Sequence, residues 1–106
     1  ITFSGGEPFL QAAELAEVAA AAHLINLDIV TYTGFTYEEL IEDNNNGVKA
    51  LLSATDILID GKYIHELRSI VLPFCGSSNQ RIIDVAETRE KEHIVLWKHL
   101  NSHVID

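Results

Sequence analysis

The chain has 106 residues, of which 47% are hydrophobic and 22% are charged, so it can build the core of one ordinary domain. Its formal net charge is −9, and residues 1–60 hold ten acids and a single base, which excludes the basic surface of a nucleic-acid binder. No apolar run approaches a membrane span, and the first residues do not resemble a signal peptide. The single cysteine excludes an internal disulfide framework and an all-cysteine metal site made by this chain alone, and it favours a cytoplasmic location.

The first segment predicts a strand followed by a helix. Ile1–Phe3 is short, apolar and β-prone, and glycines break it at once. Pro8 suits the first position of a helix, which we expect to run to about Leu24. The expected buried stripe of this helix consists of Leu15, Val18, Ala22 and Ile25. Because a domain rarely begins in mid-strand, we expect residues 1–106 to be a single domain that forms part of a larger fold.

The next segment repeats the pattern. Residues 27–33 are rich in β-branched side chains and end at Gly34, which predicts a second strand. Thr36 and Glu39 have the spacing of a capping box and predict a helix that ends near Asn44. A shorter helix is expected over about 48–53, and a third strand over 57–59.

This alternation of strands and helices, without hairpin turns, predicts an α/β fold with parallel strands and crossover helices. The last third of the chain is less regular. We expect two further short strands there, at 81–85 and 94–97.

Each of the first three strands ends in a corner that combines glycine with polar side chains. These corners are Ser4–Pro8, Tyr32–Gly34 and Asp60–Lys62. Ligands of parallel sheets bind outside the carboxyl ends of the strands, so the corners could form a site; the alternative is that they serve turn geometry alone. Asp60 lies at the exit of its strand and is a site candidate, whereas Asp56 lies at the entry and is expected to be solvated or to cap a turn.

The other chemistry-bearing residues carry weaker signals. His99 and His103 have helical ligand spacing but no third ligand, so we expect no metal site. Cys75 has no neighbouring His–Asp pair and is expected to be a free thiol with a structural or an incidental role. Arg81 could bind a carboxylate or phosphate, or its loop could be anchored by local hydrogen bonds.

Four segments, in order along the chain, resemble the radical S-adenosylmethionine activating enzymes. Residues 1–11 are similar to the Gly-Gly-Glu-Pro segment of that family, and residues 28–40 look like its next strand and helix. Residues 56–61 and 76–85 narrow the similarity to the activating enzymes of anaerobic ribonucleoside-triphosphate reductase, as does the stretch 94–97.

The resemblance implies a partial (β/α)6 barrel, in which a [4Fe-4S] cluster cleaves S-adenosylmethionine reductively. It also implies that the radical passes to a glycine of the partner, anaerobic ribonucleoside-triphosphate reductase, and that a flavodoxin- or ferredoxin-type protein donates the electron. No nucleic-acid or membrane partner is expected.

The resemblance also implies roles for individual residues. Gly5, Gly6 and Glu7 would meet the methionine amino group of the cofactor, largely through backbone, and Thr33 would lie near the same moiety. Asp60 and Lys62 match an Asp-x-Lys pair that contacts the amino, carboxylate or ribose groups of the cofactor. Asn79 and Arg81 match the family less closely.

The chain departs from the family in two places. The family holds its cluster with Cys-x3-Cys-x2-Cys upstream of the Gly-Gly-Glu-Pro strand, a motif that this chain lacks and that Cys75 cannot replace. Tyr32 stands where related activating enzymes often have an acid. We therefore expect the C-terminal portion of an activating enzyme, inactive alone, whose exposed first strand favours a homodimer.

Two alternatives remain open from the sequence. The chain could be a non-catalytic α/β module that binds a ligand or a protein. It could also belong to the activating enzyme of a different glycyl radical enzyme, although the Ser78–Arg81 segment argues against this.

Overall fold

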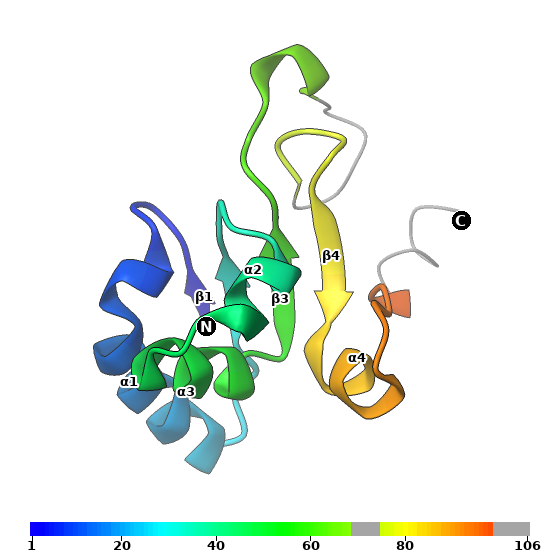
Figure 1. The fold of residues 1–106 in the computed structure, drawn as a ribbon. Coiled ribbons are helices and arrows are strands. Elements are labelled where there is room, and N and C mark those ends of the chain that lie inside the picture. Colours follow the sequence, from blue (N-terminus) through cyan, green and yellow to red (C-terminus); the bar gives the residue numbers. More distant parts are fainter. Residues whose placement is uncertain (69–74, 99–106) are drawn as a thin grey trace.

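The computed structural model describes residues 1–68 and 75–98, which form a four-stranded sheet with helices packed against it (Figure 1). The strands are β1 (Thr2–Phe3), β2 (Val30–Tyr32), β3 (Ile57–Asp60) and β4 (Arg81–Asp84). The α-helices are α1 (Ala12–Leu24), α2 (Tyr37–Glu42), α3 (Asn46–Ala54) and α4 (Val85–Lys91). Two 3-10 turns, Pro8–Gln11 and His65–Leu67, complete the described elements.

The first three strands confirm the predicted topology. The sheet order is β1-β2-β3-β4, and β1 pairs with β2 and β2 with β3 in parallel. The loops that follow β1, β2 and β3 therefore leave the same edge of the sheet, at the top of Figure 1. This is the edge at which the glycine corners were expected to meet.

The fourth strand corrects the expectation of a wholly parallel sheet. β4 runs antiparallel to β3, with Asp60 opposite Arg81 and Ile57 opposite Asp84. A parallel return needs a crossover, usually a helix, whereas the described part of this connection contains only a 3-10 turn, at 65–67. The described parts of this connection, residues 61–68 and 75–80, instead lie beyond the edge of the sheet (Figure 1). The sheet is thus mixed, and its described strands do not establish the expected partial barrel.

The segment expected as a strand at 94–97 contacts the outer edge of β4. Ile83 and Leu96 form an isolated antiparallel bridge, and the Trp97 N–H donates to the Ile82 carbonyl at 2.9 Å. β1 is the strand at the other end of the sheet order, as the sequence predicted. The pair His99 and His103 lies outside the described residues.

Helix α1 buries Ala22, as predicted, but its buried face otherwise differs from the predicted one. Its buried residues are Ala12, Ala19 and Ala22. Val18 and Ile25, expected in the core, are 47% and 69% exposed. The small alanine side chains allow α1 to pack closely on α3, and this close packing outweighs burial of the larger side chains. Leu15 is partly buried against the core, so one of the larger predicted residues does contribute.

The helix caps follow the local sequence. Thr36 and Glu39 form the predicted capping box at the start of α2. The Asn45 side chain accepts the Val48 N–H at 3.1 Å and begins α3 two residues earlier than expected. The first N–H groups of a helix have no partner within the helix, and an asparagine side chain at the N-cap position supplies an acceptor for one of them.

The two faces of the sheet differ in what covers them. Phe3, Thr31, Leu58 and Ile83 stand in one row across the four strands. Three members of this row, all but Thr31, belong to the core formed with the helices. The neighbouring row of Tyr32, Ile59 and Ile82 must face the opposite side, because side chains alternate along a strand. By the same alternation Asp60 shares the helix-covered face with Leu58.

Within the described residues, no helix has the length and apolar character needed to cross a membrane.

We expect close helix packing to make Ala19 intolerant of larger side chains. Ala19 is fully buried, so Ala19→Leu should lower the free energy of unfolding by about 2 kcal/mol through overpacking. Ala20→Leu, on the exposed side of the same helix, should change it by less than about 0.5 kcal/mol. Urea denaturation of both variants measures the difference, and equal losses would contradict the packing described here.

Candidate functional site

A cavity of about 240 Å³ lies at the carboxyl edge of the parallel strands. It is lined by Gly5, Gly6, Glu7, Pro8, Tyr32, Thr33, Gly34, Gly61, Tyr63 and Gln80. Four of the six predicted site residues line it, namely Gly5, Gly6, Glu7 and Thr33, whereas Asp60 and Lys62 do not. The loops that follow β1, β2 and β3 thus converge on one pocket.

A larger cavity, of about 500 Å³, lies between α2 and the end of α4. Its lining includes Tyr37, Ile41, Arg89 and His93, and none of the predicted site residues. Because parallel sheets bind ligands at the carboxyl ends of their strands, the smaller cavity is the better candidate site.

The Glu7 carboxylate joins the first two corners of this pocket. Its oxygens accept the Thr33 hydroxyl at 2.9 and 3.0 Å and the Gly34 N–H at 2.7 Å. One oxygen also accepts the Phe9 N–H at 3.0 Å and so caps the 3-10 turn after β1. Since these protein groups occupy the carboxylate, Glu7 shapes the pocket and leaves ligand contacts to the backbone beside it.

Gly5 and Gly6 leave the pocket wall open. Gly5 has φ +88°, a conformation that disfavours side chains. A Cβ atom added to Gly6 would meet nothing within 4 Å. Unlike Gly5, Gly6 does not have a positive φ that disfavours a side chain. The space beside Gly6 is therefore open, at the corner where a ligand was expected from the sequence.

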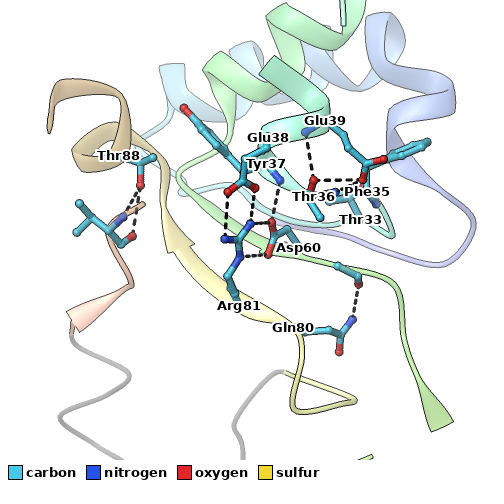
Figure 2. A network of polar contacts seen from close by, with 12 residues as sticks. Thr33, Phe35, Thr36, Tyr37, Glu38, Glu39, Asp60, Gln80, Arg81 and Thr88 are labelled. Carbon is cyan, nitrogen blue, oxygen red and sulfur yellow. Dashed lines mark hydrogen bonds and ion pairs between the residues drawn. The ribbon is translucent and has the colours of Figure 1, made fainter. Parts of the chain in front are cut away.

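Asp60 lies outside the pocket, because its side chain points to the helix-covered face. It is 1% exposed, and its oxygens accept the Tyr37 N–H at 2.8 Å and the Arg81 guanidinium at 3.0 and 2.5 Å (Figure 2). A carboxylate so buried and so bonded cannot also receive the ammonium of a ligand in this arrangement. Its position instead makes it a support for the start of α2 and of β4.

Arg81 extends this network to the protein surface. Its guanidinium also donates to Glu38 at 2.7 Å, so one arginine holds two acids (Figure 2). The hydrogen bond from Arg81 holds the pKa of Glu38 below its usual value, and bonds to Asp60 and Glu38 raise the pKa of Arg81. Arg81, considered from the sequence as an anion ligand, is thus engaged within the protein.

The chain beyond β3 forms an ordered arm, which we define as residues 61–68 and 75–80. The Gln80 amide donates to the Gly61 carbonyl at 3.0 Å and accepts the N–H groups of Gly76 and Ser77. Asn79 donates to the Lys62 carbonyl at 2.9 Å. Lys62 is exposed on this arm, between two residues that line the pocket.

Asp56 ties two elements together at the opposite edge of the sheet. One carboxylate oxygen accepts the Ile29 N–H at 2.7 Å and lies 2.9 Å from Nε2 of His23. The predicted local, non-ligand role of Asp56 agrees with this geometry.

The described residues contain no group of three or more His, Cys, Asp or Glu side chains that could hold a metal ion. Cys75 is buried and free, and burial, reinforced by the nearby Asp60 charge, raises the pKa of its thiol. Such a thiol is poorly suited to act as a nucleophile at neutral pH.

The family model described as "4Fe-4S single cluster domain" matches residues 1–83. The chain belongs to this family. It is also 34% identical over 87 residues to the anaerobic ribonucleoside-triphosphate reductase-activating protein of Vibrio cholerae serotype O1, which covers 77% of the chain and 53% of that relative. The proteins of the same name from Salmonella typhi and Salmonella typhimurium are 31% identical over 85 residues, covering 76% of the chain and 52% of each relative. No solved structure matches this chain significantly.

These matches confirm the resemblance drawn from the sequence, with one restriction. The chain spans about half the length of the curated relatives it matches. It also has a single cysteine, although an iron–sulfur cluster is held by several thiolates. The residues present therefore do not fit a [4Fe-4S] cluster, despite the description of the family.

Sequence reasoning missed two residues of the pocket, Tyr63 and Gln80, and it included Tyr32 only as part of a corner. The place of Tyr32 in the pocket wall follows from its position at the end of β2, one residue before Thr33. Gln80 reaches the pocket because β4 begins opposite the end of β3, beside Gly61 and Tyr63, and no local pattern indicates this pairing.

Asp60 and Asp56 should differ in their contribution to stability. Asp60→Asn leaves Arg81 without its buried partner and should cost about 3 kcal/mol of unfolding free energy. Asp56→Asn affects a half-exposed pair and should cost less than about 1 kcal/mol. Urea denaturation measures both, and a loss for Asp56→Asn as large as that for Asp60→Asn would refute the network.

Proposed function

We propose that this chain is part of a glycyl-radical activating enzyme that acts on anaerobic ribonucleoside-triphosphate reductase. In the proposed reaction, S-adenosylmethionine, one electron and a glycine hydrogen of the reductase give methionine, 5′-deoxyadenosine and a glycyl radical. The electron would come from a flavodoxin- or ferredoxin-type donor, and the protein would work in the cytoplasm.

The observation that carries the proposal is the joined glycine corner. Glu7 fastens the Gly5–Gly6 turn to Thr33 and Gly34 at the carboxyl edge of parallel strands. The same segment lies within residues 1–83, which match the family model, and the chain is similar to relatives named as activating proteins of anaerobic ribonucleoside-triphosphate reductase. The form of the pocket and this relationship together support the proposal.

The pocket offers groups suited to the zwitterionic end of S-adenosylmethionine. Backbone carbonyls at Gly5, Gly6 and Glu7 can accept from an ammonium, and the open space at Gly6 leaves room for it. Thr33 lines the same wall. Lys62 is exposed beside the pocket and can reach toward the carboxylate as a flexible point charge. Asp60 acts as a positioning residue, because it holds the exit of β3 and the start of α2 in place.

S-adenosylmethionine, when bound, supplies a carbon–sulfur bond that one-electron reduction can break. The cysteines that would hold the cluster are not part of these 106 residues, so we propose that this chain contributes the cofactor-binding half of the activity and is inactive by itself.

A non-catalytic binding module is the competing function, since a pocket at a strand edge can bind a ligand without chemistry. It would bind S-adenosylmethionine no better than unrelated amino acids or nucleosides. The second alternative is that the partner is a different glycyl radical enzyme. Measuring radical formation on the purified reductase and on other purified glycyl radical enzymes distinguishes between these partners.

Gly6→Val should weaken ligand binding without harming the fold. A Cβ atom at this position meets no protein atom within 4 Å, and the Val side chain takes up the open space beside Gly6, so S-adenosylmethionine affinity should fall at least tenfold, which is about 1.4 kcal/mol. NMR titration of the amide signals of Gly5, Gly6 and Gly34 measures this change and locates the ligand. Asp56→Asn, at the opposite edge, is the matched control and should bind as the unaltered chain does. Binding by Gly6→Val that equals the control would count against this pocket.

The chain should remain colourless after anaerobic treatment with iron and sulfide, because one thiol cannot hold a cluster. It should then produce no 5′-deoxyadenosine from S-adenosylmethionine and dithionite. Visible absorption and chromatography test both statements. A cluster spectrum together with 5′-deoxyadenosine from these residues alone would overturn the assignment of a partial activity.

A further inference from the structure

Tyr63 is an aromatic wall of the pocket that none of the predicted roles uses. It lines the cavity at the exit of β3, whereas the Gly5–Gly6 corner lines it at the exit of β1. Its side chain is 49% exposed, although a tyrosine of this size would gain by burying its ring. An exposed ring that borders a pocket is available to a ligand.

The ring is held in position by the arm. A Cβ atom added to Gly76 would lie 2.9 and 3.1 Å from two atoms of the Tyr63 ring, so the ring packs directly on the Gly76 backbone. The Tyr63 hydroxyl lies 3.3 Å from Nδ1 of His65. The Gln80 side chain accepts the Gly76 N–H at 2.7 Å and donates to the Gly61 carbonyl, so it links the backbone behind the ring to the end of β3. The Tyr63 ring is therefore held in place by the protein itself, as a preformed platform beside the pocket.

The polar groups near the ring are already used. The Gln80 side-chain amide already forms hydrogen bonds with the backbone of Gly61, Gly76 and Ser77. The Tyr63 hydroxyl contacts His65. What Tyr63 can offer a ligand is its flat face. Aromatic side chains stack well on nucleic-acid bases, and such stacking tolerates differences between bases.

We propose that Tyr63 stacks on the purine of the adenosyl group, as a binding residue for that half of the ligand. The inference rests on the proposed function, which places the methionine end at the Gly5–Gly6 corner. The remainder of the ligand must then extend across the exits of β2 and β3, toward Tyr63. A cavity of about 240 Å³ is small for a whole nucleoside–amino acid conjugate, so an exposed platform at its border suits the purine.

The test compares two ligands that share one end. S-adenosylhomocysteine carries both the amino acid and the purine, whereas methionine carries only the amino-acid end. Tyr63→Leu should weaken S-adenosylhomocysteine roughly tenfold and leave methionine binding unchanged, because stacking on one base is lost. Tyr63→Phe keeps the ring and should bind both ligands as the unaltered chain does.

Two further variants guard against a general effect on the arm. Gly76→Ala displaces the ring and should reproduce the loss seen for Tyr63→Leu. Leu67→Ala removes an exposed apolar side chain of the same arm that does not line the pocket, and it should change neither affinity. NMR titration reports dissociation constants for all variants, and their spectra confirm that each is folded.

The outcomes separate the two proposals. If Tyr63→Leu weakens methionine as much as S-adenosylhomocysteine, or weakens neither, the stacking role is wrong while the proposed function stands. If the unaltered chain binds neither ligand at its glycine corner, the proposed function fails and the stacking role fails with it.

Discussion

The structure depends on one buried carboxylate. Asp60 ends β3, pairs with the first residue of β4 and accepts the first amide of α2. A buried charge is costly unless it is fully paired, so these three elements must meet at this point for the chain to fold. The register of the antiparallel pair and the position of α2 follow from that requirement. The pocket lies just outside this junction, on the other side of the same strand ends.

A second acid shapes the pocket itself. Glu7 fastens the loop after β1 to the loop after β2, and its carboxylate is occupied by protein donors. Both acids near the strand exits thus serve the fold, and the pocket surface is left to backbone, aromatic rings and a neighbouring lysine. Under the proposed function, this surface would receive the zwitterionic end and the purine of S-adenosylmethionine.

Under the proposed function, the single cysteine implies that the ligands of the cluster are not supplied by the residues that form the pocket. The described fold contains the strand edge and the glycine corner, and the sequence supplies a single, buried thiol. A cluster needs several thiolates, so the redox half and the cofactor-binding half would lie in different segments. This division agrees with the match to about half the length of the curated relatives.

Local patterns in the sequence by themselves determined the three parallel strands, the capping box at Thr36 and Glu39, and the meeting of glycine corners at one edge. The capping box depends on residues three positions apart, and the parallel strands with their common edge follow from the alternation of strands and helices along the chain. Only the tertiary structure decided the direction of β4, the alanine face of α1 and the arm that brings Tyr63 to the pocket. It also turned Asp60 away from the pocket, because alternation along β3 set its face while the distant Arg81 and Tyr37 supplied its partners. Contacts between residues twenty or more positions apart depend on how whole elements pack, and no short sequence pattern carries that information.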